Sequence, residues 1–142
     1  MLTDRIEKLL IDFEQFNNWE DKYKHLISMG KKLPIMDDSY KTDANKIKGC
    51  QSQVWLFPEL VEGKILFHAD SDASIVKGII SLLLEVYNDA TAEEILATRP
   101  TFLKDLGLSE HLSMSRANGL NAMIKQISMY ALAIKTKLQM NL

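Results

Sequence analysis

The β-structure that this sequence favours is confined to two short runs in the middle of the chain. Residues 53–59 and 64–68 are rich in branched and aromatic side chains, which fit the pleated surface of a strand. Residues 60–63, which end in glycine, separate the runs as a turn. The two runs therefore predict a β-hairpin. Pro58 fits an edge position, because proline cannot donate to the hydrogen-bond ladder of a sheet.

Helical periodicity dominates on both sides of this hairpin. Before it, apolar residues at helical spacing predict a helix over residues 3–16, with Thr3 as its N-cap, and a second helix from Trp19. Asn18 is expected to cap the second helix and Gly30 to end it. The polar, irregular residues 33–48 predict a connecting loop.

After the hairpin, a buried helix is expected to begin at Ser71 or Asp72, either of which would cap it, and to end near Asn88. The pattern of residues 91–94 is a capping box and opens a short helix to about Ala97. Another helical turn lies between residues 100 and 107, and a long helix opens at residue 113 or 115. The sequence thus predicts an α+β fold, with helices at both ends packed on a small, largely antiparallel sheet.

Overall composition narrows the classes of function. The length of 142 residues is usual for a single domain, 1–142. The formal net charge of −2 provides no basic footprint for nucleic acid. No stretch reaches the roughly 18 consecutive apolar residues of a membrane helix, and the first residues mix acids and bases unlike a signal peptide. We therefore expect a cytoplasmic protein that binds neither nucleic acid nor membrane.

Metal and cofactor motifs are not found. Cys50, His25, His68 and His111 are scattered along the chain and lack the paired spacing of a zinc site. One thiolate is too few to hold an iron–sulfur cluster. The sequence has no glycine-rich phosphate loop and no GxSxG elbow. We therefore expect this chain to bind no metal and no cofactor.

The only cysteine, Cys50, lies in the stretch KIKGCQSQVW, residues 46–55. A lone intracellular cysteine is often a small buried apolar residue, and the residues alone leave that interpretation open. The alternative is a nucleophile. Gly49 suits a tight turn, and Lys46 and Lys48 would favour the thiolate, which is the form that attacks sulfur. Those two lysines would otherwise form a solvated face or contact a partner.

A different nucleophilic role is that of a cysteine hydrolase. It would require His68 or His111 to fold within hydrogen-bonding reach of Cys50, and the sequence cannot place these side chains together.

Longer motifs surround the cysteine. They are Gly49-Cys50-Gln51-Ser52-Gln53-Val54-Trp55 and Asp70-Ser71-Asp72-Ala73, the latter followed by Ile75-Val76-Lys77-Gly78. Further matches are residues 19–23, Gly30, residues 33–34, residues 111–113, Arg116, residues 119–120 and Met123. In these motifs the chain resembles the SufE family, the sulfur acceptors of the SUF iron–sulfur assembly pathway. The resemblance covers almost the whole chain and is weaker at residues 36–45 and at the C-terminal tail.

The resemblance implies a role for Cys50. It would take persulfide sulfur from a SufS-type cysteine desulfurase, stimulate that enzyme, and deliver sulfur to the Suf scaffold complex. The chain would be a sulfurtransferase-like accessory subunit, and pyridoxal phosphate (PLP) would belong to the desulfurase alone. An IscU-like fold and a monomer or weak homodimer are also expected. A binding module that activates the desulfurase allosterically, without carrying sulfur, remains the alternative.

Supporting roles are expected for the neighbours of Cys50. The residues that would hold its loop are Gly49, Gln51, Ser52 and Gln53. Asp70 and Asp72 are expected foremost to cap the following helix, and otherwise to shape the loop or contact the desulfurase. Arg116 would either pair with an acid or lie beside the cysteine. Between transfers the loop is expected to tuck its sulfur against Val54 and Trp55.

Overall fold

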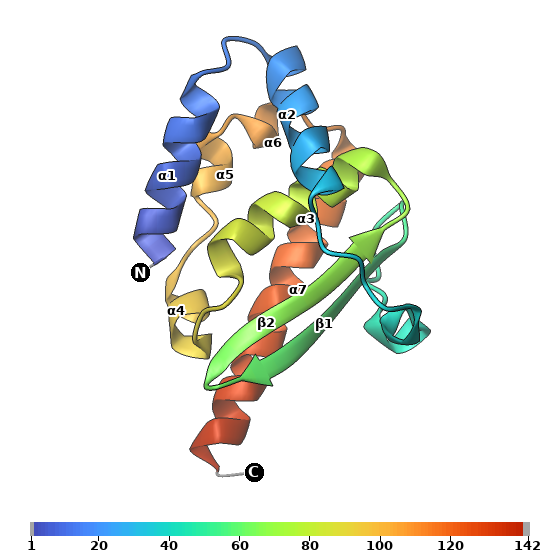
Figure 1. Ribbon diagram of the computed structural model, residues 1–142, viewed down its shortest axis with the longest axis vertical. Coiled ribbons are helices and arrows are strands. Elements are labelled where there is room, and N and C mark those ends of the chain that lie inside the picture. The colour runs from blue at the N-terminus through green and yellow to red at the C-terminus, as the bar shows by residue number, and fades with distance from the viewer. Residues whose placement is uncertain (1, 141–142) are drawn as a thin grey trace.

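A computed structural model describes residues 2–140 of the chain. Its elements are α1 (Leu2–Glu14), α2 (Trp19–Lys31), the short 3-10 helices η1 (Asp38–Tyr40) and η2 (Asp43–Asn45), strands β1 (Val54–Val61) and β2 (Lys64–Ser71), and then α3 (Ser74–Tyr87), α4 (Ala92–Ala97), α5 (Phe102–Asp105), α6 (Leu108–His111) and α7 (Met114–Gln139). The strands form one antiparallel sheet. The predicted α+β class is confirmed. Figure 1 shows α7 running along the long axis of the molecule, behind the hairpin.

The hairpin is longer and its turn tighter than predicted. The strands pair from Val54 with Ser71 to Val61 with Lys64, so the predicted four-residue turn shrinks to Glu62 and Gly63. Both turn residues have positive φ, 51° and 83°. This conformation matches the right-handed twist of the strands and is the usual two-residue connection of a hairpin.

The two faces of the hairpin have different neighbours. Side chains of one face, among them Val54, Leu56 and Ala69, are buried and meet residues of α3 and α7 around a common apolar space. On the opposite face, the Tyr40 ring stacks on Phe57 with the ring centroids 4.8 Å apart. Because side chains alternate along a strand, the sheet is covered on one face by the helices and on the other by η1.

Helices α2 and α3 cross at very short range, which corrects the predicted role of Gly30. This residue does not end α2, which continues to Lys31. A Cβ atom on Gly30 would lie 2.6 Å from the Gly78 nitrogen, and one on Gly78 would lie 2.2 Å from the Leu26 carbonyl oxygen. Both glycines are therefore required by the contact between the two backbones.

Several predicted helix caps are confirmed. The Asn18 side chain accepts a hydrogen bond from the Asp21 amide at 2.9 Å. Thr91 and Glu94 form the predicted capping box, and Ser113 caps α7. These caps lie within a few residues of the amides that they satisfy, so local sequence is sufficient to predict them.

Other predicted caps are wrong. Thr3 lies inside α1, which already includes Leu2. Helix α3 begins at Ser74, after Ala73, whose side chain makes no capping hydrogen bond. Ser71 is the last residue of β2. The Asp72 carboxylate accepts a hydrogen bond from the Gln53 amide, which lies before β1. The strand thus extends further along the chain than the predicted start of the helix.

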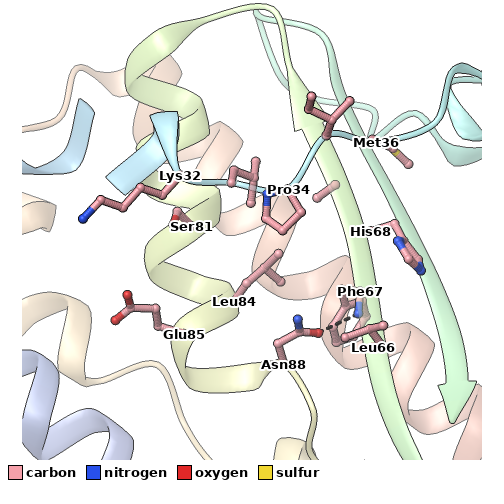
Figure 2. A pocket seen from close by; sticks show the side chains of 13 residues that line it. Lys32, Pro34, Met36, Leu66, Phe67, His68, Ser81, Leu84, Glu85 and Asn88 are labelled. Atoms are coloured by element: carbon pink, nitrogen blue, oxygen red, sulfur yellow. Dashed lines mark hydrogen bonds between the residues drawn. The ribbon is translucent and has the colours of Figure 1, made fainter. Parts of the chain in front are cut away.

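A cavity of about 280 Å³ lies between the segment after α2, strand β2 and α3 (Figure 2). At its end, the Asn88 side-chain oxygen accepts a hydrogen bond from the Phe67 amide at 2.6 Å, so Asn88 satisfies an outward-facing amide of β2. Neither Cys50 nor any of its predicted supporting residues lines this cavity. Within residues 2–140, no helix combines the length and the apolar character needed to span a membrane.

Candidate functional site

Cys50 lies in a short loop between the 3-10 segment and β1. The loop begins after Ile47, whose amide donates to the Val54 carbonyl at 2.8 Å. Gly49 has a φ of +90°, and a Cβ atom built on it would lie 3.8 Å from the Ala122 Cβ of α7. A positive φ strains other residues, so glycine is the natural residue for this turn. The loop therefore lies against α7.

The Cys50 thiol rests on α7 at Gly119. Its Sγ donates to the Gly119 carbonyl at 3.7 Å, and a Cβ on Gly119 would lie 3.5 Å from Sγ. Sequence reasoning assigned no site role to Gly119. The available signal was its position inside a long predicted helix, where glycine costs about 1 kcal/mol relative to alanine. Such a glycine indicates a packing or functional reason.

A hollow of about 130 Å³ opens beside the thiol. It brings Cys50 together with three of its predicted neighbours, Gln51, Ser52 and Arg116. The remaining walls, most of which sequence reasoning did not place here, are Val54, Val76, Ile79, Ser115, Gly119 and Met123. The chemistry that the hollow suits is the sheltering of a small, largely apolar group attached to the sulfur.

Of the two residues expected to shelter the sulfur, the structure brings Val54 into the hollow but not Trp55. The indole instead lies with the Lys41 ammonium nitrogen 5.8 Å from its ring centroid. Adjacent residues of a strand point to opposite faces, so Val54 and Trp55 cannot both face the thiol.

Asp72 closes the C-terminal end of the loop. Its Oδ1 accepts a hydrogen bond from the Gln53 amide at 3.0 Å, and the Asp72 amide donates to the Gln53 carbonyl at 3.3 Å. The expected capping of α3 by this carboxylate is therefore wrong. Its contact instead holds Gln53 to the segment between β2 and α3, as the alternative interpretation required.

Asp70 also has a different role from helix capping. Its oxygens contact Lys41 Nζ at 2.9 Å and Lys77 Nζ at 3.4 Å. Burial raises the pKa of Asp70, but hydrogen bonds from Lys41 and the Ser71 amide, together with the charge of Lys77, hold it below its ordinary value. Asp70 thereby joins the segment that precedes the cysteine loop to α3. Sequence reasoning missed Lys41, because nothing local links it to a carboxylate far along the chain.

Burial raises the pKa of the Cys50 thiol above its ordinary value. Its contact with the Gly119 carbonyl acts in the same direction, because only the protonated sulfur can donate to it. Lys46 and Lys48 line a separate hollow that does not include Cys50. The expectation that these lysines favour the thiolate is therefore wrong for the loop in this position.

The remaining candidates lie apart from the thiol or exposed beside it. The His68 ring nitrogen contacts Glu59 at 2.8 Å, and the His111 ring stacks on Trp19. Neither lines the hollow, so the base that a cysteine hydrolase requires is not in place.

Arg116 is exposed, and within residues 2–140 no carboxylate lies within ion-pair distance of it. The same residues contain no cluster of ligands suited to a metal ion.

The chain is similar to a known protein family in sequence and to a solved structure in fold. A family model, SufE, described as an Fe-S metabolism associated domain, matches residues 7–131. The chain belongs to the SufE family. The fold is also similar to a solution structure of a hypothetical protein from Thermus thermophilus, with a TM-score of 0.77 and 21% sequence identity over 93% of this chain and 96% of that chain. At that identity the likeness concerns the fold. This SufE-family chain is thus associated with iron–sulfur metabolism.

The raised pKa predicts how the thiol of this SufE-family chain responds to pH. We expect its reaction with a small aromatic disulfide to be slow at neutral pH and to accelerate as pH rises through a value above that of a free cysteine, since only the thiolate reacts. Stopped-flow absorbance across a pH series measures this profile. A midpoint at or below that of a free cysteine peptide would contradict the prediction.

Asp72→Ala tests whether closure of the cysteine loop is the cause of the slow thiol reaction at neutral pH. Loss of the hydrogen bond to Gln53 is expected to cost about 1 kcal/mol of loop closure and so to raise reactivity at neutral pH about fivefold. The matched control is Asp43→Ala, which removes another exposed carboxylate that makes no contact with residues 50–53. An equal increase in thiol reactivity in both variants would show that the change in net charge, rather than the loss of the hydrogen bond to Gln53, is responsible.

Proposed function

We propose that this SufE-family protein accepts and carries sulfur for iron–sulfur cluster assembly, with Cys50 as the acceptor. The observation that carries the proposal is the placement of the chain's only cysteine. It lies on a glycine turn, directly over Gly119, beside a hollow of about 130 Å³ with mainly apolar walls. A purely structural cysteine would need neither the turn nor the hollow.

The proposed donor is a SufS-type cysteine desulfurase that holds a persulfide, R–S–SH, on its own active-site cysteine. Its PLP would remain with that enzyme. The Cys50 thiol loses its proton to solvent, and the thiolate attacks the terminal sulfur of the donor. The donor S–S bond breaks, and the donor thiolate leaves and takes up a proton. The products are R–SH and Cys50–S–SH, so the exchange is redox-neutral and needs no additional oxidant.

Two properties of the site fit a cycle of opening and closing. In the closed loop, burial disfavours the thiolate, so the reactive form develops when the loop leaves Gly119 for the donor. After transfer, the hollow of about 130 Å³ exceeds the roughly 30 Å³ that one water molecule occupies in the liquid, and one additional sulfur atom fits. Closure would keep the persulfide from reductants until the protein meets its recipient, which we propose to be the Suf scaffold complex.

Intact-protein mass spectrometry tests the proposal. After incubation with a SufS-type desulfurase and L-cysteine, we expect the mass to increase by one sulfur atom and peptide mapping to place that atom on Cys50. Treatment with a reductant should remove it. Omission of the desulfurase is the control, because free cysteine cannot supply persulfide sulfur. A reaction mixture in which the desulfurase turns over while Cys50 stays unmodified would exclude sulfur carriage.

A further inference from the structure

Helix α7 has an unusual charge composition. From Met114 to Gln139 it contains Arg116, Lys125, Lys135 and Lys137, but no aspartate and no glutamate. The whole chain has a formal net charge of −2, so the part outside α7 is distinctly acidic. Helix α7, against which the Cys50 loop lies, is thus net positive in a chain whose other residues together are net negative.

The outer face of α7 also exposes apolar side chains. Met114 is 81% exposed, Met129 53% and Leu132 56%. Together with Lys125 they recur at helical spacing along one stripe, which spans about 27 Å at 1.5 Å per residue. The opposite stripe, including Leu120, is buried in the core. The helix therefore has two apolar faces, of which only the inner one has a partner within residues 2–140.

The cysteine loop extends this basic face. Lys46 and Lys48, from the segment before Cys50, line an open hollow together with Lys125 and Met129. Asp43 is the one carboxylate among the residues lining this hollow. Arg116 lines the hollow of Cys50 itself. Cations thus line both hollows beside the cysteine loop, Arg116 in the hollow of Cys50 and three lysines with the exposed Met129 in the other.

We propose that the outer face of α7, with Lys46 and Lys48, is the docking surface for an acidic, partly apolar surface of the sulfur donor. This inference rests on the proposed function and names the surface that the donor contacts. A protein that delivers sulfur to Cys50 must cover the surroundings of the thiol, and those surroundings carry positive charge. Cations at the rim would steer an acidic partner toward this face, while unbranched methionines adapt to its apolar contacts.

The composition of the face favours a protein over nucleic acid as its partner. Binding of single strands relies on exposed aromatic rings that stack with bases. The one aromatic side chain of α7, Tyr130, is partly buried and donates to the Leu56 carbonyl. The exposed apolar residues of the face are aliphatic or methionine instead.

The test is a charge reversal, Lys48→Glu with Lys125→Glu, in a Cys50→Ser background. Isothermal titration calorimetry with a SufS-type desulfurase measures docking without sulfur transfer. We expect the dissociation constant to rise about tenfold or more at about 0.05 M salt. The unreversed chain should lose affinity as salt increases to about 0.5 M, whereas the reversed chain should respond much less. Lys125→Glu alone, which leaves the cysteine loop unaltered, should give an intermediate value.

The matched control is Lys64→Glu with Lys104→Glu, which changes net charge equally at exposed positions at the start of β2 and in α5. It should change the dissociation constant less than about threefold. Equal weakening in the control, or no weakening in either variant, would overturn the proposal. Sedimentation that shows a wild-type dimer lost on charge reversal would assign the face to a second copy, and duplex DNA binding lost on reversal would assign it to nucleic acid. Either result also overturns it.

This design separates the surface from the proposed function. Docking is measured without the thiol, so an absence of persulfide on Cys50 does not affect the titration. Conversely, normal persulfide formation combined with unchanged docking of the reversed chain would reject the surface and leave sulfur carriage standing.

Discussion

Cys50→Ser is expected to eliminate sulfur acceptance and the stimulation of the desulfurase together. A serine hydroxyl occupies nearly the same space as the thiol, but it is not ionised near neutral pH and does not attack sulfur. We expect the sulfur transferred to this chain to fall at least about 100-fold, since covalent transfer depends on the nucleophile itself. The measurement is the initial rate of alanine formation from L-cysteine, with and without the chain, together with its mass.

The same variant distinguishes carriage from allosteric activation. Cys50 is half-buried and its sulfur has one hydrogen bond in the described structure, so its replacement should cost no more than about 1 kcal/mol of stability. Docking, measured by calorimetry, should persist. If Cys50→Ser docks and still stimulates the desulfurase fully, the protein is an allosteric activator, and the carrier function is wrong.

The elements that sequence analysis predicted well are those defined by local patterns. The capping box at Thr91 and Glu94 is complete within four residues, and the cap at Asn18 reaches only to Asp21. The hairpin and the long C-terminal helix follow in the same way from side-chain periodicity. Each of these features is specified by neighbours in the chain, which the sequence displays directly.

The errors arose where distant segments meet. Gly30 had the form of a helix stop, but its function is the close approach of α2 to Gly78. Asp72 had the form of an N-cap, but its carboxylate binds the Gln53 amide of the cysteine loop. In both cases the residue type predicted a role in its own helix, whereas in the structure the residue makes a contact with a distant segment.

In the candidate site, too, features specified by local sequence were predicted and features that depend on tertiary contacts were not. The motif around Cys50 indicated the nucleophile, and its resemblance to the SufE family suggested the chemistry. The support provided by Gly119 depends on α7 passing beneath the loop, which no local pattern reveals. The direction of the pKa shift was also missed, because the lysines near Cys50 in sequence line another hollow and burial dominates.

Gly78→Ala is expected to produce the largest loss of stability. In an ordinary helix this change adds about 1 kcal/mol of stability, because alanine is the better helix former. Here the new Cβ would lie 2.2 Å from the Leu26 carbonyl oxygen, a backbone atom that moves only if α2 moves. We expect a net loss of about 3 kcal/mol or more, measured as the free energy of unfolding in urea.

Gly119→Ala provides the matched control for Gly78→Ala, since it makes the same change inside another helix. Its Cβ would meet the Cys50 Sγ at 3.5 Å, an ordinary contact, so stability should be unchanged or higher by up to about 1 kcal/mol. Changes of opposite sign in the free energy of unfolding of the two variants would establish that the crossing of α2 and α3, rather than helix propensity, causes the loss of stability in Gly78→Ala.

Helix α3 also contributes Val76 and Ile79 to the hollow of Cys50. Its displacement in Gly78→Ala should therefore make the thiol more reactive, whereas a stable Gly78→Ala protein with normal thiol reactivity would contradict this account of the crossing.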